Sequence, residues 1–123
     1  MKLNPFLYVA NVRDSMAFYH EILGFNVGEL YPDEYNPTFA PMLMDGHKLL
    51  LEEVDVELPC YHKHGVCGSG VQLFLEVPNV DETYEKLKKS AQVVDQIADR
   101  PWGRTFSISD PDGYIISFYN SSP

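Results

Sequence analysis

The chain has 123 residues, 45% hydrophobic and 13% aromatic, which suffices for one domain with its own core. Its 18 acidic residues against 9 Lys and Arg give a net charge of -9, which disfavours nucleic acid and anionic membranes and favours cationic partners. The N-terminal residues lack the apolar segment of a signal peptide, and no apolar run is long enough to span a membrane. We therefore expect a cytoplasmic protein, in which both cysteines are free thiols.

The first half of the sequence predicts a strand, a helix and three further strands. The first strand is expected near residues 3–9, and Asn11 is a candidate helix N-cap. Gly24 stands where that helix would end. The apolar stripe of the helix is expected to contain Val12, Met16, Tyr19 and Leu23. The three later strands are expected near residues 26–30, 38–44 and 47–54.

The second half repeats this order. The pattern Val-x-Asn-Val and the later pair Asp-Gly each occur twice, at nearly the same separation, which indicates a duplicated module. Asn79 is the second candidate N-cap, before a stripe formed by Val80, Tyr84 and Leu87. The strands of this half are expected near residues 71–77, 92–97, 104–109 and 114–120. We therefore expect one domain with module 1 at about 1–56, a linker at about 57–69 and module 2 at about 70–121.

Alternation along the predicted strands separates two faces of each sheet. One face is aliphatic and should lie under the helix, as in Leu73 and Leu75. The other face mixes aromatic rings with polar and acidic groups, as in Phe74 and Glu76. The sequence therefore predicts an α+β fold of two tandem β-α-β-β-β modules, related by a pseudo-twofold, whose mixed faces would line a cleft.

The stretches VANVRDSMAFYHEILGF and RPWGRTFSISDPDGYIISFY resemble the vicinal oxygen chelate superfamily, which includes glyoxalase I, fosfomycin resistance enzymes, extradiol dioxygenases and bleomycin resistance proteins. Pro101-Trp102-Gly103-Arg104, then Phe106 and Asp110-Pro111-x-Gly113, are most similar to the bleomycin resistance type. The resemblance implies mixed sheets that form a half-open barrel, and a homodimer whose clefts are built from one module of each chain.

Enzymes of this superfamily hold a divalent metal with His or Glu from the first and last strands of both modules. The corresponding positions here are Asn4, Leu50, Gln72 and Ser117, none of them a His or a carboxylate. Two amides, a hydroxyl and a leucine lack the charge for a tight transition-metal site, so we expect no metal and no cofactor. A strand register shifted by one residue would replace this set, which leaves a metal-dependent enzyme as an alternative.

Two other groups of residues suggest metal binding. Cys60, His62, His64 and Cys67 fall in the linker, but their spacing matches no usual zinc motif, so zinc stays an open alternative to a loop that happens to contain them. Asp110 and Asp112 resemble the start of a calcium loop, yet Tyr114 and Ser121 occupy its later ligand positions. Asp-Pro-Asp-Gly is therefore interpreted as a tight turn that sets the register of the next strand.

The candidate ligand-binding residues are the aromatic and polar side chains of the mixed faces and of the segments that border the crevice by resemblance. They are Phe6, Tyr8, Tyr31, Tyr35, Phe39, Glu52, Tyr61, Gln72, Phe74, Glu76, Trp102, Ser117 and Tyr119. Rings of this kind stack on flat ligands and carboxylates attract cations. Trp102 is the strongest candidate, because a large ring beside a glycine before a strand is seldom fully buried.

The sequence predicts a bleomycin resistance-type protein that sequesters a cationic, partly aromatic antibiotic in a dimer cleft without metal and without altering it. The alternatives are a metal-dependent glyoxalase-like or dioxygenase-like lyase or isomerase, and a metal-free isomerase with Glu52 or Glu76 as general base. A third is an interaction module that binds no small molecule. Elemental analysis separates the metal enzymes from the binder, and a ligand-induced thermal shift separates the binder from the interaction module.

Overall fold

The computed structural model describes residues 1–54 and 70–120. The chain divides into two compact units, Met1–Cys67 and Gly68–Pro123. The described part of each unit is called here the first and the second module. Each contains a strand, a helical segment and three further strands in that order, with a four-stranded mixed sheet. The chain therefore has the α+β architecture of two β-α-β-β-β modules that its sequence predicts.

The first module's sheet has the strand order β1-β4-β3-β2, in which only the β1 and β4 pairing is parallel. Its strands are β1 (Phe6–Val9), β2 (Asn26–Val27), β3 (Phe39–Met44) and β4 (His47–Glu53). Alternate residues of β1, β3 and β4 are almost fully buried and make the core, as the aliphatic pattern predicts. These residues are Leu7, Val9, Ala40, Met42, Leu49 and Leu51.

The helix of the first module starts as α1 (Val12–Ala17) and continues as a π-helical turn, η1 (Phe18–Ile22). Asn11 is its N-cap as expected, because the side chain accepts a 3.0 Å hydrogen bond from the Asp14 amide. At the other end Gly24, with φ of 82°, donates to the carbonyl of His20. The chain leaves the helix there, also as expected.

The buried face of this helix differs in part from the predicted stripe. Val12 and Tyr19 are buried as expected, but Ser15 and Phe18 are buried as well, whereas Met16 is only half-buried. The π-helical turn places two adjacent rings, Phe18 and Tyr19, in the core with centroids 5.1 Å apart. A pattern read at 3.6 residues per turn does not anticipate this change of pitch.

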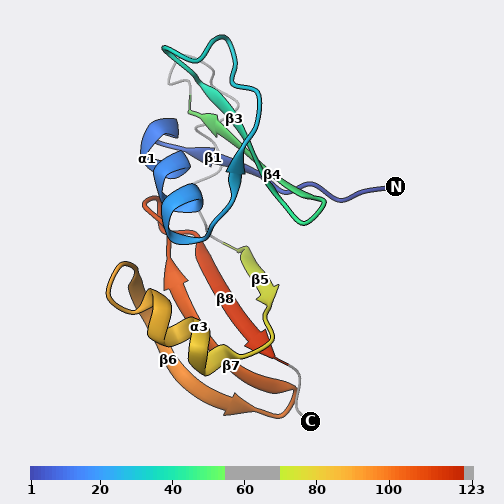
Figure 1. Ribbon diagram of the computed structural model, residues 1–123, viewed down its shortest axis with the longest axis vertical. Coiled ribbons are helices and arrows are strands. Elements are labelled where there is room, and N and C mark those ends of the chain that lie inside the picture. The colour runs from blue at the N-terminus through green and yellow to red at the C-terminus, as the bar shows by residue number, and fades with distance from the viewer. Residues whose placement is uncertain (55–69, 121–123) are drawn as a thin grey trace. The chain divides into compact units, whose positions relative to one another are not determined.

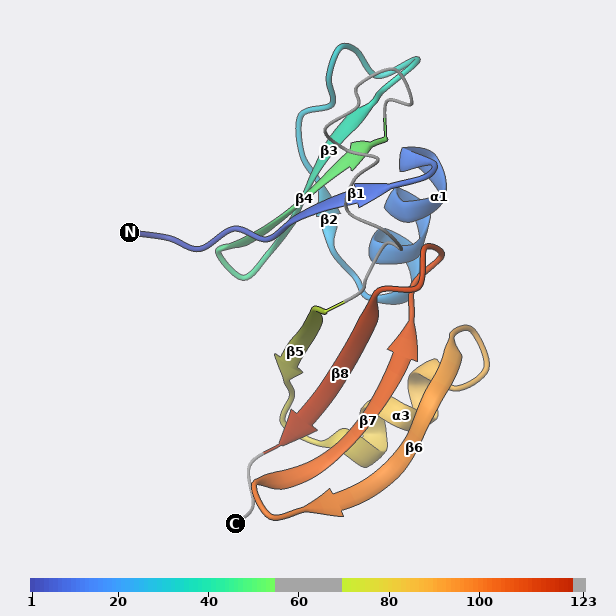
Figure 2. The same ribbon diagram turned by 180° about the vertical axis from the view of Figure 1, so that it is seen from behind.

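The second module's sheet has the order β5-β8-β7-β6, with β5 and β8 parallel and the other pairs antiparallel. Its strands are β5 (Gln72–Glu76), β6 (Gln92–Arg100), β7 (Gly103–Ser109) and β8 (Ile115–Asn120). The helix α3 (Val80–Leu87) crosses one face of the sheet (Figures 1 and 2), and its Val80 and Leu87 are buried. The sheet residues buried on that face are Phe106, Ile108, Ile116 and Phe118.

The two helices begin in the same way. The backbone amide of Val12 donates a 3.1 Å hydrogen bond to Glu53 Oε1, at the end of β4. The amide of Val80 donates a 3.0 Å hydrogen bond to Asn120 Oδ1, at the end of β8. A side chain from the last strand therefore satisfies an otherwise unpaired amide at the start of each helix, in addition to the Asn caps.

The Asp-Gly pair of each module lies in a turn before its last strand. Asp45 and Gly46, with φ of 48° and 81°, connect β3 to β4 in a two-residue hairpin. In the second module the buried Asp110 accepts hydrogen bonds from the amides of Asp112 and Tyr114 through Oδ1. The interpretation of Asp-Pro-Asp-Gly as a turn is confirmed, since Asp110 caps the loop's own backbone.

Several strand boundaries differ from those expected. The first strand begins at Phe6, because the preceding Pro5 has no amide hydrogen to continue the ladder, and Leu3 is 91% exposed. The strand expected near residues 26–30 spans only Asn26–Val27. In contrast β6 runs to Arg100, and two register shifts leave some of its residues without a partner on the shorter β7. Within the described ranges, no helix is long and apolar enough to cross a membrane.

Candidate functional site

The face of the second sheet opposite α3 brings together most of the predicted ligand-binding residues of that module. In the parallel pair β5 and β8, Phe74 is in register with Ser117, and Glu76 with Tyr119. Residues in register share a face, and alternation places Gln72 on the same face as Phe74 and Glu76. This surface is called here the open face of the second module.

Three aromatic rings border a shallow, open pocket on this face. Phe74 comes from β5, Tyr119 from β8 and Trp102 from the turn between β6 and β7. Together they line a shallow pocket of about 340 Å³. Phe74 is 50% exposed and Trp102 is 52% exposed, so both rings keep free surface. Large apolar side chains that stay exposed around a concavity are typical of a binding site.

A carboxylate lies at the edge of this pocket. The hydroxyl of Tyr119 donates a 3.0 Å hydrogen bond to Glu76 Oε1. This hydrogen bond, together with the negative charge of Glu76, raises the pKa of Tyr119 above its usual value. Tyr119 therefore stays a neutral donor at physiological pH, and Glu76 presents an exposed acidic group beside the rings.

Next to the rings, along the same strands and on β7, lies a chain of hydrogen-bonded polar side chains. Ser117 Oγ donates a 3.0 Å hydrogen bond to Gln72 Oε1, and Ser107 Oγ lies 2.7 Å from Ser117 Oγ. Because Ser117 gives its only proton to Gln72, Ser107 is the donor to Ser117. Ser117 is 2% exposed and Ser107 5% exposed. Ser107 is not among the predicted site residues, but the alternation of Thr105, Ser107 and Ser109 along β7 is a signal that could have identified it.

The corresponding face of the first module, called here its open face, carries a second cluster of aromatic rings. Phe6 contacts Tyr8 and Phe39, with centroids 5.2 and 6.0 Å apart, and Tyr31 lies 6.1 Å from Phe39. Glu52 is in register with both Tyr8 and Phe39, and it is half-buried. Four predicted rings and a predicted carboxylate of this module therefore share one face or its border.

The two modules place the same pair of residue types at matching positions, but in opposite order. In the first module Tyr8 on the first strand is in register with Glu52 on the last. In the second, Glu76 on the first strand is in register with Tyr119 on the last. Each open face therefore combines a tyrosine with a carboxylate between two parallel strands.

The acidic loop of the first module is held by local contacts. Asp33 Oδ1 accepts 2.9 Å hydrogen bonds from the amides of Tyr35 and Asn36, and Arg13 donates to the Tyr35 carbonyl. The Tyr31 hydroxyl donates to Glu29 Oε2, which raises the pKa of Tyr31. Tyr35 is 74% exposed and, unlike Tyr31, is not placed against the ring cluster by any described contact. Tyr61, the remaining predicted ring, lies outside the described residues.

The residues at the family's metal positions do not form a charged donor set. In the second module Gln72 and Ser117 lie together, but they are hydrogen-bonded to each other and both are neutral. In the first module Leu50 pairs with Phe6, while Asn4 precedes β1 and is exposed. These groups do not fit a divalent transition metal. Across residues 1–54 and 70–120, no three His, Cys, Asp or Glu side chains are grouped as metal ligands. The predicted cluster Cys60, His62, His64 and Cys67 lies outside the described residues.

Comparison with known proteins identifies a family and a fold. Residues 2–118 match the sequence profile described as "Glyoxalase/Bleomycin resistance protein/Dioxygenase superfamily". No curated protein sequence gives a significant match. Three solved structures, all below 25% identity, show the shared fold.

TioX from Micromonospora sp. ML1 is 17% identical with a TM-score of 0.78, and the match covers 99% of both chains. TnmS3, an antibiotic binding protein from Streptomyces sp. CB03234, is 24% identical with a TM-score of 0.73, over 99% of this chain and 98% of its own. The bleomycin-binding protein of Streptomyces verticillus, in complex with copper(II)-bleomycin, is 18% identical with a TM-score of 0.70, over 99% and 97%.

Proposed function

The chain belongs to the glyoxalase/bleomycin resistance protein/dioxygenase superfamily, and we propose that within it the chain is a small-molecule binding protein of the bleomycin resistance type. It sequesters a cationic, partly aromatic ligand of the antibiotic kind without a metal and without altering it. Two structural neighbours are an antibiotic binding protein and a bleomycin-binding protein, which supports a ligand of this class.

The observation that carries the proposal is the pocket of Phe74, Trp102 and Tyr119 with Glu76 at its edge. The rings offer apolar surface and π faces, and the carboxylate offers a negative charge in a chain whose net charge is already -9. A ligand with aromatic and cationic parts is attracted to both features.

The donor chemistry favours binding over metal-dependent catalysis. The hydroxyl of Ser117 and the amide of Gln72 are committed to each other at 3.0 Å and carry no charge. For a metal-free isomerase, a general base needs a pKa raised by burial and a second group that converges on the substrate. Glu76 is instead exposed and accepts the hydrogen bond of Tyr119.

The proposal includes a homodimer in which the open face of the first module of one chain and that of the second module of the other chain line each ligand cleft. In support, both faces carry exposed rings and a carboxylate. Two chains would then bind two ligands. Size-exclusion chromatography with light scattering should give twice the 14.0 kDa of the chain. A monomer that binds ligand with full affinity would remove this part of the proposal.

The proposed function is tested by calorimetric titration with metal-free bleomycin and with ethidium, a planar aromatic cation. Trp102→Ala should weaken the binding of whichever of these ligands the wild type accepts by tenfold or more, on the scale of about 1.5 kcal/mol for a ring contact. Val94→Ala is the matched control, because Val94 is an exposed apolar residue that does not line the pocket.

The proposal fails if neither compound binds at millimolar concentration. It also fails if Trp102→Ala binds the ligand as tightly as the wild type and the Val94→Ala control do. Circular dichroism and the midpoint of thermal unfolding show whether Trp102→Ala keeps the fold. We expect it to do so, because half of the Trp102 side chain already faces solvent.

A further inference from the structure

The planes of Phe74, Trp102 and Tyr119 are nearly perpendicular to one another, like the three walls that meet in a corner. This arrangement of the three rings is called here the corner. Phe74 and Trp102 have an interplanar angle of 73°, Phe74 and Tyr119 one of 68°, and Trp102 and Tyr119 one of 78°. The three centroids are 5.8, 5.9 and 6.3 Å apart in the same order. No two of these rings are parallel, so they form no slot for a flat molecule.

Three nearly perpendicular rings favour a compact group of the ligand over a planar one. A planar heteroaromatic group can stack on one of three nearly perpendicular rings but cannot lie along all of them. A compact, roughly spherical group can touch all three at once. Since the face of each ring carries partial negative charge, the compact group that gains most is a cation.

The edge of the corner adds a full negative charge. Glu76 accepts the hydrogen bond of Tyr119 at 3.0 Å, which holds the carboxylate beside the ring. The raised pKa of Tyr119 keeps that phenol protonated, so the hydrogen bond persists to alkaline pH. A ligand cation in the corner therefore meets three ring surfaces and a nearby counter-charge.

A methylated ammonium suits these walls better than a primary amine. The ring surfaces contain no strong hydrogen-bond acceptor, so a primary ammonium placed against them loses hydration that they do not replace. A trimethylammonium group donates no hydrogen bonds, is weakly hydrated, and buries its methyl groups against the rings.

We propose that the corner formed by Phe74, Trp102 and Tyr119, with Glu76 at its edge, binds a quaternary or otherwise fully methylated ammonium group of the ligand. The inference rests on the proposed function, and it assigns one part of the ligand to one module. A flat aromatic part of the ligand can stack on only one of these three rings.

The test uses choline and its neutral carbon analogue, 3,3-dimethylbutan-1-ol, as matched probes of equal shape. Trp102 is the only tryptophan of the chain, so its fluorescence reports binding at the corner directly. We expect saturable binding of choline with a Kd in the millimolar range and binding of the neutral analogue at least fivefold weaker. We expect Glu76→Gln, which retains an acceptor for Tyr119, to weaken choline binding about threefold or more.

Glu85→Gln is the matched control, because Glu85 lies on α3, on the side of the sheet away from the corner, and its replacement should leave the choline Kd unchanged. Equal affinity for choline and the neutral analogue, or a choline Kd that Glu76→Gln leaves unchanged, would overturn the inference. If bleomycin or ethidium binds but choline does not, the corner assignment fails and the proposed function stands. If choline binds and neither larger compound does, the corner is supported and sequestration of an aromatic cation fails.

Discussion

Glu76 and Tyr119 are in register across the parallel strands β5 and β8, and the Tyr119 hydroxyl donates a 3.0 Å hydrogen bond to Glu76 Oε1. The hydrogen bond favours the neutral phenol, so the pKa of Tyr119 is raised above the ordinary value of about 10. The associated stabilisation is fully present below the unfolded pKa. It is lost as the pH rises through the higher folded value.

Replacing the carboxylate tests this relationship. We expect Glu76→Gln to lower the pKa of Tyr119 towards its ordinary value, as followed by the ¹³Cζ chemical shift of the ring. Glu29→Gln is a matched control, because it removes the corresponding partner of Tyr31 and should lower the pKa of Tyr31 alone. If the Tyr119 pKa is the same in the wild type and in Glu76→Gln, the negative charge of Glu76 does not raise it, which would contradict this account of the pair.

The buried pair Ser107 and Ser117 should behave as one energetic unit. Ser117→Ala removes the acceptor of the Ser107 hydroxyl and leaves that buried group unpaired, at a cost of about 1 to 3 kcal/mol in unfolding free energy. The double variant Ser107→Ala/Ser117→Ala should cost less than the sum of the two single variants. Urea unfolding of all four proteins measures this coupling, and strictly additive losses would contradict it.

The side-chain acceptor from the last strand should stabilise the start of α3. Asn120→Ala removes the acceptor of the Val80 amide and should lower the unfolding free energy by about 1 kcal/mol. Asn120→Asp keeps an acceptor oxygen at this position and should recover most of that loss. An Asn120→Ala protein as stable as the wild type would show that the amide finds another partner at no cost.

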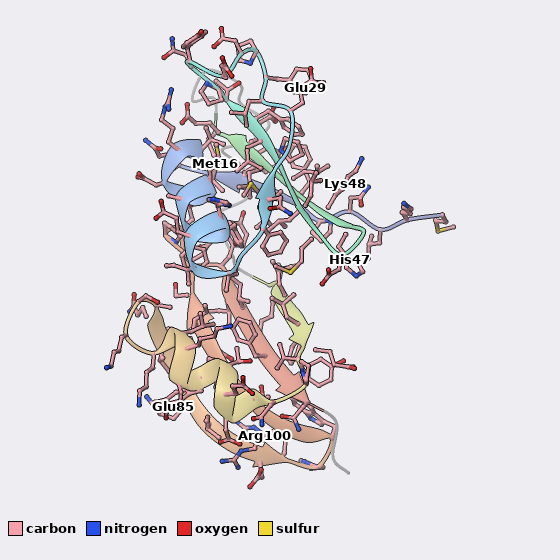
Figure 3. All side chains as sticks on the ribbon, in the orientation of Figure 1. Met16, Glu29, His47, Lys48, Glu85 and Arg100 are labelled. Atoms are coloured by element: carbon pink, nitrogen blue, oxygen red, sulfur yellow. The ribbon has the colours of Figure 1, made fainter. Side chains whose placement is uncertain are left out.

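Arg100 should oppose cation binding at the corner. Arg100 (labelled in Figure 3) is the last residue of β6 and is exposed. It pairs with Gly103 across the turn that carries Trp102. Arg100→Gln removes a like charge and should tighten choline binding about twofold at low salt, with the difference fading at high salt. Lys88→Gln is the control, because Lys88 lies at the C-terminal end of α3 and pairs with Glu85. Weaker choline binding in Arg100→Gln would contradict this electrostatic account.

Much of the fold could be predicted because the helix caps and the strand alternation gave the same element order in both halves of the duplicated sequence. Asn11 and Asn79 were predicted as caps from residue type and from their place before a helical pattern, and each accepts the expected amide hydrogen bond. The alternation in β5 and β8 correctly separated the face under α3 from the open face. The start of β1 was predicted too early although Pro5 is a local signal against it, and the buried face of the first helix was predicted only in part because the helical pitch changes in η1.

The site could be predicted only as a set of residues on one face. Alternation placed Phe74 and Glu76 together, and the turn before β8 correctly set Ser117 beside Gln72. The near-perpendicular arrangement of Trp102 against Phe74 depends on a turn and on side-chain packing that no sequence period encodes. For the same reason the hydrogen bond between Ser107 and Ser117 was not predicted from the sequence.

The central claim, that the chain holds its ligand without a metal and without altering it, is tested most directly by one recovery experiment. Protein treated with EDTA and dialysed is loaded with whichever of bleomycin or ethidium it binds. The complex is then denatured, and the released compound is measured by mass spectrometry. We predict stoichiometric binding to the metal-free protein and recovery of the compound with its mass unchanged. Binding that is lost with EDTA and restored by a divalent metal, or a released compound of altered mass, would contradict the account.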